Sequence, residues 1–345
     1  MIKTLHLLSA CAFLACIVIG IPTTNAQEYT CSTLESISEI NLLKSKKSNF
    51  VIFAEDSHND NLINRQHVFD YMVSIKQQGF NQLALEAAVA YEYVSSLEDT
   101  TVINGLVGPL NYSFLRRLLL YNKENQDTPV NVRGFDVETY PPFALNMLDF
   151  ILKKYPAKPK ELDELHLAIE KIRLMSSEEE QSDSIKELAI KIKQYNPRST
   201  GVFSESDSAY FFKISNNLKM GVLFNFKDWK LREKYIFQNI ESINNESNNK
   251  SVILIGSQHV DKKVYRNVPS LYTMMLEKGM LKPETDSAPV ILFKKDNNTA
   301  ERLGLYKIPK KDKEYIMKYI SQYSGLIYCA GSKIEKPAKG YLFYE

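Results

Sequence analysis

The chain has few of the residues and short motifs that mark several large protein classes. Its 345 residues include four cysteines and one tryptophan, and no two cysteines are spaced as C-x-x-C. That absence excludes the common structural zinc sites and thioredoxin-type redox centres. The sequence also lacks G-x-S-x-G, G-x-x-x-x-G-K-[ST] and G-x-G-x-x-G. An ordinary α/β-hydrolase, a P-loop enzyme and a Rossmann dehydrogenase are therefore not expected.

An excess of charge of one sign is lacking as well. The chain carries 43 Lys and Arg against 41 Asp and Glu, for a formal net charge of +2. Nucleic-acid-binding surfaces are clearly basic, so no nucleic-acid partner is expected. With 44% hydrophobic residues, the chain can bury a sizeable core as one large domain.

Long apolar runs are confined to the beginning of the chain. Lys3 is followed by an apolar stretch over residues 7–21 and then by Thr24-Asn25-Ala26. This pattern is typical of a secretory signal peptide that is removed after Ala26, and the run is short for a membrane span. We predict a secreted or periplasmic protein without a stable membrane span, in which residues 27–345 form one domain. A lipoprotein is the less favoured alternative, because only ten residues precede Cys11.

Signal removal would leave two cysteines, one near each end of the chain: Cys31 and Cys329. In an oxidising compartment they could form a disulfide that ties the two ends together. Two free thiols are an equal alternative, because the sequence does not place the two Cα atoms.

What the sequence does contain is a set of short apolar runs that stop at ionisable side chains. Residues 49–59 (NFVIFAEDSHN) lead into Glu55, Asp56 and His58. Three further runs behave alike: 82–86 ends in Glu86, 130–138 reaches Asp136 and Glu138, and 251–259 reaches Ser257 and His259. Because the carboxyl ends of parallel strands meet at one edge of a sheet, these side chains are expected to converge on one crevice.

Helical patterns separate these strands, which predicts an α/β fold with a mostly parallel or mixed central sheet flanked by helices. Residues 61–78 show a helical stripe that ends at Gly79. Residues 100–129 read as an irregular, partly helical crossing. Residues from about 141 to 228 are predicted to form a helical insertion that caps the sheet and frames the substrate entrance, divided by a polar break at 176–184. After a helix at 229–245, the last strand is expected at 326–329.

Carboxylates combined with two histidines suit two kinds of chemistry. An imidazole can deprotonate water for attack on an acyl group, with carboxylates orienting it. Alternatively, His58, His259 and the acids can hold a divalent metal. The remaining histidines, His67 and His166, fall within predicted helices and are expected to be structural.

Several motifs resemble those of the erythromycin esterase family and its ChaN-like and Tiki relatives. The segment Ala-Glu-Asp-Ser-His at 54–58 is similar to the family's Gly-Glu-x-x-His motif. Further similarities follow in the family's order over the rest of the chain: the strand ending at Glu86, the Gly-Phe-Asp segment at 134–136, the helix beginning Arg232-Glu233, the late strand ending at His259, and a closing strand at 325–328 with Pro337. The resemblance implies the erythromycin-esterase/ChaN-like fold and hydrolysis of an ester of a small molecule, with a lactone included.

The resemblance also implies roles for individual residues. His58 would be the general base that activates water, Glu55 and Glu86 would orient it, and Arg232 and His259 would stabilise the developing oxyanion. Asp136 would lie beside them, with Asp56 and Ser257 in supporting or substrate-binding positions. The sequence departs from the family pattern at four positions: Ala54 and Glu233 replace a glycine and an aspartate, Asp56 adds a charge, and Asn59 stands where glycine is frequent.

Two further readings follow from the relatives. The Tiki branch implies a metal-dependent hydrolase or peptidase, and its ligands to Mn, Fe or Zn here would be Glu55, His58, Glu86, Asp136 and His259. The ChaN-like branch implies haem or iron binding at the cell envelope. A reaction without cofactor is the favoured prediction.

Overall fold

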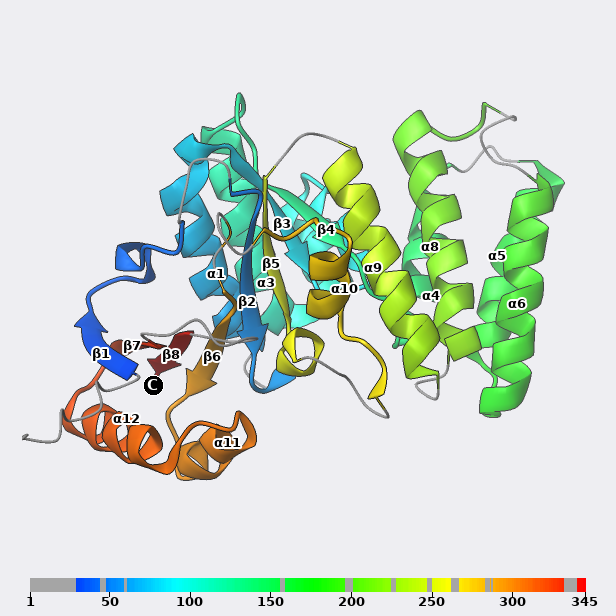
Figure 1. Cartoon of the computed structure of the whole chain (residues 1–345). Coiled ribbons are helices and arrows are strands. Elements are labelled where there is room, and N and C mark those ends of the chain that lie inside the picture. Colours follow the sequence, from blue (N-terminus) through cyan, green and yellow to red (C-terminus); the bar gives the residue numbers. More distant parts are fainter. Residues whose placement is uncertain are drawn as a thin grey trace, which may run out of the picture.

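The computed structural model describes residues 29–43, 48–58, 61–155, 159–195, 201–224, 228–246, 250–261, 267–282, 286, 288–331 and 340–345. An eight-stranded mixed sheet forms its centre, with strand order β1-β7-β8-β6-β2-β5-β3-β4. The strands are β1 (Tyr29–Leu34), β2 (Phe50–Glu55), β3 (Phe80–Leu85), β4 (Asn131–Gly134), β5 (Lys250–Gly256), β6 (Val290–Lys294), β7 (Leu326–Gly331) and β8 (Gly340–Tyr344). The predicted α/β class is confirmed (Figure 1).

The four strands that the sequence marked by their polar ends are direct neighbours. β2 pairs with β5, β5 with β3 and β3 with β4, and all three pairings are parallel. β6 and β8 continue the parallel part, whereas β7 runs antiparallel to both β8 and β1. The ends of β2, β5, β3 and β4 therefore lie side by side along one edge of the sheet.

Side chains alternate between two buried cores, one on each face of the sheet. Val51, Phe53 and Leu83 belong to the first core, and Ile52 and Ala54 belong to the second. The first core is closed by α1 (Asn61–Ile75), α2 (Val89–Ser95) and α3 (Thr100–Glu124). The second is closed by α9 (Trp229–Asn245), α10 (Leu271–Glu277) and α12 (Lys310–Gln322). Continuous apolar runs are what parallel strands buried on both faces require.

Helix α1 and the turn after it form as the sequence predicts. The short helix η3 (Lys76–Gln78) follows α1, and Gly79 ends it with a φ of 91°, a conformation that only glycine adopts without strain. The crossing at 100–129 was predicted wrongly, because it is one helix, α3, of 25 residues. The segment contains Gly105 and Pro109, residue types that ordinarily interrupt helices, but buried residues such as Phe114 and Leu118 pack the helix into the first core. Tertiary packing outweighs local propensity in this segment.

Four helices from the predicted insertion pack together beyond β4: α4 (Pro141–Lys153), α5 (Lys160–Arg173), α6 (Glu178–Tyr195) and α8 (Glu205–Phe224). They lie beside α9 at the right of Figure 1. The predicted polar break at 176–184 is confirmed in part. α5 ends at Arg173 and α6 begins at Glu178, so residues 176–177 lie between the two helices, while 178–184 form the first turns of α6, where carboxylates favour the positive helix end. Between these helices, a continuous set of buried aliphatic side chains joins the first core.

The sheet's other edge carries the elements that the sequence did not reveal. β1 and β8 were missed, so the strand at 326–331 is not the last one, and the short helices η1 (Ile37–Glu39) and α11 (Thr299–Leu305) were missed as well. Cys31 and Cys329 are opposite each other on β1 and β7 and form a disulfide. Pro337, Asn59 and the predicted signal peptide lie outside the described residues. Within the described residues, no helix is both long and apolar enough to cross a membrane.

Candidate active site

A cavity of about 460 Å³ opens at the carboxyl ends of β2, β5, β3 and β4. The eight residues that were predicted to form or support the site lie around it, whereas Glu138, which the strand pattern also placed at this edge, is not part of the described wall. The lining consists of Glu55, Asp56, His58, Glu86, Asp136, Thr139, Trp229, Arg232, Gly256, Ser257, Gln258 and His259. None of these residues comes from the described parts of the helical region at 141–228. That region borders the site through α8, where the Asn217 amide donates to the carbonyl oxygen of Asp136 at 2.8 Å.

His58 is the accessible imidazole of the cavity. Its side chain is 64% exposed, whereas Glu55 behind it is 4% exposed. The Nδ1 atom of His58 lies 3.6 Å from Oε1 of Glu55, and the amide of Asn64 on α1 donates to Oε2 of Glu55 at 3.0 Å. The contact with Glu55 raises the pKa of His58 above its ordinary value, although partial burial works in the other direction. His58 thus has a fixed carboxylate on one side and open space on the other.

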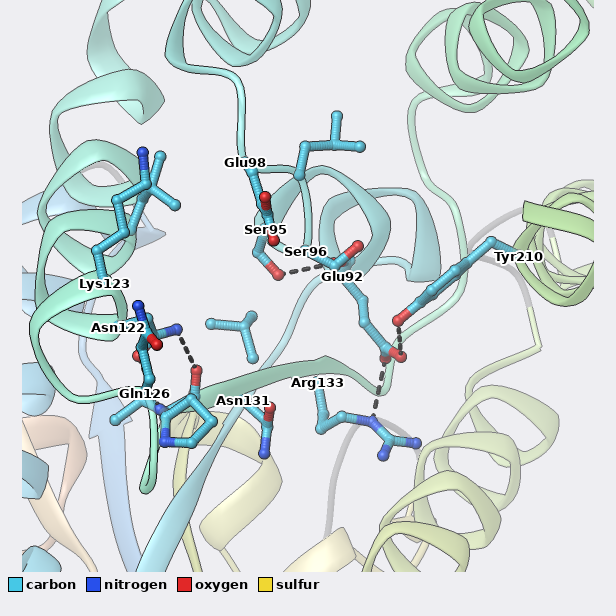
Figure 2. A pocket seen from close by; sticks show the side chains of 15 residues that line it. Glu92, Ser95, Ser96, Glu98, Asn122, Lys123, Gln126, Asn131, Arg133 and Tyr210 are labelled. Carbon is cyan, nitrogen blue, oxygen red and sulfur yellow. Dashed lines mark hydrogen bonds and ion pairs between the residues drawn. The ribbon is translucent and has the colours of Figure 1, made fainter. Parts of the chain in front are cut away.

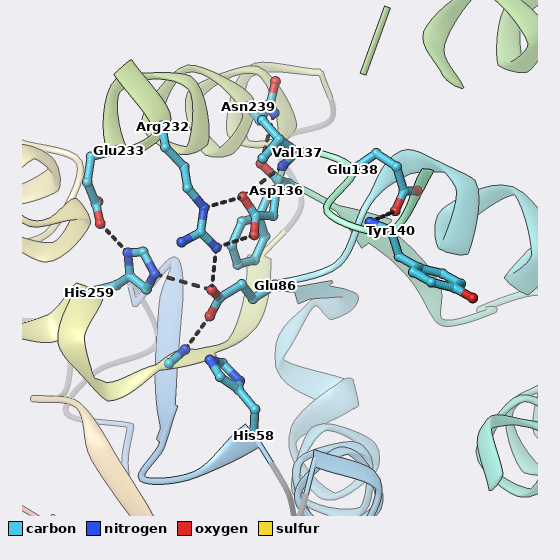
Figure 3. A network of polar contacts seen from close by, with 12 residues as sticks. His58, Glu86, Asp136, Val137, Glu138, Tyr140, Arg232, Glu233, Asn239 and His259 are labelled. Carbon is cyan, nitrogen blue, oxygen red and sulfur yellow. Dashed lines mark hydrogen bonds and ion pairs between the residues drawn. The ribbon is translucent and has the colours of Figure 1, made fainter. Parts of the chain in front are cut away.

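Glu86 is the most heavily contacted carboxylate of the site (Figure 3). Its Oε1 accepts from Nη2 of Arg232 at 3.0 Å and lies 3.2 Å from Nε2 of His259. Its Oε2 accepts the backbone N–H of Gly256 at 2.5 Å. Burial alone would raise the pKa of Glu86, but the charges of His259 and Arg232 hold it well below its ordinary value. Glu86 is therefore a fixed negative charge.

The sequence analysis gave no role to Glu233, although it follows Arg232 directly. Its fully buried carboxylate makes an ion pair with Nδ1 of His259. Burial would lower the pKa of His259, but Glu86 and Glu233 outweigh it and raise this pKa to about 10. His259 is consequently an imidazolium at neutral pH. It cannot act as a base, because both ring nitrogens already carry protons directed at carboxylates.

Arg232 joins the ends of β3 and β4 from helix α9. Its Nε and Nη2 donate to the two carboxylate oxygens of Asp136 at 3.1 and 2.5 Å. This is the bidentate geometry that guanidinium groups form with carboxylates. Burial raises the pKa of Asp136, although Arg232 favours its charged form. The single tryptophan, Trp229, lines the cavity with its ring 5.3 Å from the Arg232 guanidinium carbon.

Gly256 allows the ends of β2 and β5 to approach each other closely. A Cβ atom at this position would lie 3.1 Å from both Oε2 of Glu86 and Cε1 of His58. Those distances are shorter than ordinary van der Waals contact, so a larger residue would push the two side chains away. The side chains of His58 and Glu86 thus both flank Gly256.

Asp56 and Ser257, predicted to support the site, contact a segment that no motif marked. Asp56 pairs with Arg302 on α11, and both Asp56 and Ser257 contact the hydroxyl of Tyr306. Asn64 and Glu233 were also missed as partners of predicted residues. Glu233 could have been predicted from the sequence, because it directly follows Arg232. Arg302 and Tyr306 belong to a helical segment that no sequence motif marks.

The donor arrangement does not fit the predicted metal site. Both nitrogens of His259 face carboxylates, which leaves no lone pair for a metal. Glu86 and Asp136 are already engaged by Arg232, whose positive charge opposes a cation at the same place. Of the five predicted ligands, His58 is exposed, whereas Glu55 beside it is buried and already accepts from Asn64.

Haem binding is not favoured either. His67 packs against the ring of Tyr344, and His166 is hydrogen bonded to Asp149 at 2.6 Å. Neither histidine lines the described wall of the cavity. His166, Asp149 and Glu170 lie close enough to share a metal ion. However, the ammonium group of Lys153 already lies 2.6 Å from Asp149, so this group is an ion-pair cluster.

A second cavity, of about 840 Å³, lies along the edge strand β4 (Figure 2). The polar groups in its wall are largely paired with each other. The Asn122 side chain bonds both the N–H and the carbonyl of Val130, and Glu92 accepts from the N–H of Gly134 and from Tyr210. These side chains cover an exposed strand edge, which protects against pairing with other chains.

The site and the sheet together define an α/β protein with a histidine, carboxylate and arginine centre at the carboxyl edge of a mostly parallel sheet. No protein-family model matches the sequence, and no curated protein sequence matches it. The fold is that of erythromycin esterase, which confirms the resemblance at the level of the structure.

Three solved structures share this fold. A mutant of the erythromycin esterase EreC in its open conformation aligns with a TM-score of 0.54 and 12% identity, over 91% of this chain and 97% of that chain. A Bacillus cereus protein aligns with a TM-score of 0.51 and 12% identity, over 91% and 94%. A succinoglycan biosynthesis protein aligns with a TM-score of 0.54 and 10% identity, over 91% and 94%.

Proposed function

We propose that the protein is a hydrolase of ester bonds in a small molecule and that His58 is its general base. The main observation in support is the pairing of an exposed His58 imidazole with the buried carboxylate of Glu55 at the mouth of a polar cavity. An imidazole whose pKa is raised by a neighbouring carboxylate is suited to proton transfer as a general base. The erythromycin esterase fold supports this chemistry, and a lactone belongs among the substrates to test.

In the proposed reaction, His58 takes a proton from a water molecule while the water oxygen adds to the ester carbonyl. Glu55 stabilises the imidazolium that results. The tetrahedral intermediate then collapses, the bond to the leaving alkoxide breaks, and the alkoxide receives the proton from His58. Water is the only co-reactant, and the products are an acid and an alcohol.

Arg232 supplies the positive charge nearest to the reacting carbonyl in this proposal, since it lines the cavity. His259 has a different part from the one that the family resemblance implied. It is buried and faces Glu86 and Glu233, so it acts by fixing Glu86 rather than by contacting the oxyanion. Glu86 in turn keeps Arg232 and the end of β5 in place.

We also propose that the protein is exported and that residues 27–345 form the mature single domain. The support is the disulfide between Cys31 and Cys329, because such bonds persist in oxidising compartments. Mass spectrometry of the protein recovered from the producing cell would test the cleavage site. A mature chain that still contains residues 1–26 would contradict the proposal.

The function is tested by hydrolysis of nitrophenyl esters, a macrolide lactone and peptides. The variants are His58→Ala and, as a matched control outside the cavity, His166→Ala. Turnover is expected to fall by about 100-fold or more in His58→Ala and to persist in the control. EDTA is expected to have no effect. Turnover that survives in His58→Ala overturns the role of His58, and turnover that EDTA abolishes overturns the metal-free reaction.

A further inference from the structure

The hydroxyl of Tyr306 lies between the two loops that carry the histidines of the site. It is 2.9 Å from Oδ1 of Asp56 and 2.9 Å from Oγ of Ser257. Asp56 stands two residues before His58 in the loop after β2, and Ser257 stands two residues before His259 after β5. One phenol therefore connects two loops that are about 200 residues apart in sequence.

The directions of these hydrogen bonds follow from the groups involved. Burial and the carboxylate of Asp56 raise the pKa of Tyr306, so its hydroxyl keeps its proton. A phenol has one proton to donate, and a carboxylate only accepts. Tyr306 thus donates to Asp56 and accepts from Ser257.

Arg302 holds the other side of Asp56. Its Nε lies 2.6 Å from Oδ2 of Asp56, while its Nη1 and Nη2 contact Asp296 and the carbonyl of Lys294, each at 2.7 Å. The guanidinium carbon also lies 5.8 Å from the ring centre of Phe293. Since its contacts reach both ends of the β6–α11 connection, Arg302 is a fixed anchor and Asp56 is tied to it.

The spacing between the two loops matters because there is little free space between them. The side chains of His58 and Glu86 both flank Gly256, where even one added methyl group would be in tight contact. A displacement on the order of 1 Å at such a place can lower a catalytic rate about 100-fold. Tyr306 and Arg302 do not line the described wall of the cavity, so they are placed to act through the loops rather than on a substrate.

We propose that Tyr306 and Arg302 are positioning residues for the reaction: together they hold the segment of His58 at a fixed distance from the segment of His259, the residue that contacts Glu86. This inference rests on the proposed hydrolase function. It also assigns a task to Asp56, which the family's first motif does not require to be charged, and to Ser257, whose hydroxyl serves as a loop contact.

The test compares wild type with Tyr306→Phe, which keeps the ring and removes only the hydroxyl. Tyr319→Phe, on α12 among the rings of Tyr315 and Tyr323, is the matched control. Tyr306→Phe is expected to lower kcat about 10- to 100-fold with KM changed less than about threefold, and the control is expected to match wild type. Ser257→Ala should add little loss on top of Tyr306→Phe, because both remove the same contact.

A second measurement does not depend on turnover. The imidazole NMR signals of His58 are expected to shift in Tyr306→Phe and to stay in place in Tyr319→Phe. If His58→Ala shows that the protein is not a hydrolase, this shift still decides whether Tyr306 positions the segment that carries His58. Unchanged kcat or an unmoved His58 signal in folded Tyr306→Phe would overturn the proposal, as would equal effects in the two tyrosine variants.

Discussion

The carboxylate of Glu233 pairs with Nδ1 of His259, while Oε1 of Glu86 lies 3.2 Å from the opposite nitrogen of the same ring. Positive and negative groups thus alternate from Glu233 through His259 and Glu86 to Arg232 and Asp136. Each buried charge in this chain is compensated by its oppositely charged neighbours, so removing one member leaves the next charge partly uncompensated.

Removing one end of this chain is expected to destabilise the fold. Glu233→Gln leaves the imidazolium of His259 with one carboxylate in place of two, and the free energy of unfolding should fall by about 3 kcal/mol. Urea denaturation measures this change. Glu241→Gln, a similar substitution at a partly exposed position of the same helix, should change it by less than about 0.5 kcal/mol. Equal effects of the two substitutions would contradict a special role for Glu233.

The same contact predicts how stability changes at alkaline pH. The folded pKa of His259, about 10, lies above its unfolded value of about 6.5. Its contribution is therefore complete below pH 6.5 and is lost as the pH rises through about 10. In Glu233→Gln the loss should still begin near pH 6.5, the unfolded value, but it should end at lower pH because the folded pKa is lower. Denaturation midpoints measured from pH 6 to 10.5 test this, and parallel curves for the two proteins would refute it.

A second titration is expected from Glu138, which is buried just after Asp136. One of its carboxylate oxygens has no hydrogen-bond partner among the described residues, and burial raises its pKa to about 7. A carboxyl whose pKa is higher in the folded than in the unfolded protein lowers the free energy of unfolding as the pH rises between the two pKa values, here from about 4.5 to 7.

Glu138→Gln should remove this dependence, because glutamine does not ionise. Relative to wild type, the variant is expected to gain up to about 3 kcal/mol between pH 4.5 and 7. Glu179→Gln, at an exposed position of α6, should follow the wild-type curve. A constant difference between Glu138→Gln and wild type at all pH values would show that the carboxyl does not titrate there.

Much of the site could be predicted because its information is local. Each of β2, β3, β4 and β5 is a short apolar run that stops at a polar residue, and parallel strands bring such ends together. That rule placed Glu55, Glu86 and His259 around one cavity before any coordinates were considered. Arg232 came from the resemblance, since a helix pattern alone does not show which arginine turns inward.

The rest depends on contacts between distant segments. β1 is a short strand whose partner, β7, lies near the other end of the chain, so no local pattern distinguishes it from a loop. β8 pairs with β6 and with β7, the strand just before it, and was missed although one partner is close in sequence. Tyr306 contacts Asp56 across 250 positions, and neither residue signals the other. The continuous helix α3 was missed for the opposite reason, because local breakers were present and packing overrode them.

Replacing Arg232 by lysine tests whether its fork geometry is needed. Lysine keeps the charge but cannot bind both oxygens of Asp136 in the bidentate manner. We expect kcat on the best ester to fall about 100-fold and the free energy of unfolding to fall by about 2 kcal/mol. Lys230→Arg, an exposed exchange on the same helix, is the control. Wild-type kinetics in Arg232→Lys would show that charge alone suffices.

The disulfide gives a prediction that does not involve the site. Cys31 and Cys329 are 298 positions apart, so the bond closes nearly the whole described chain into one loop. A crosslink of this span restricts the unfolded chain strongly, and its loss is expected to lower the free energy of unfolding by about 2–5 kcal/mol. Denaturation with and without reductant measures this effect, and the Cys31→Ser/Cys329→Ser double variant should match the reduced protein and show no further response to reductant. Because β7 is the only described strand that pairs with β1, the reduced protein should lose protection from hydrogen exchange in β1 first. Exchange that is unchanged in β1 would mean that strand pairing, rather than the crosslink, holds this edge.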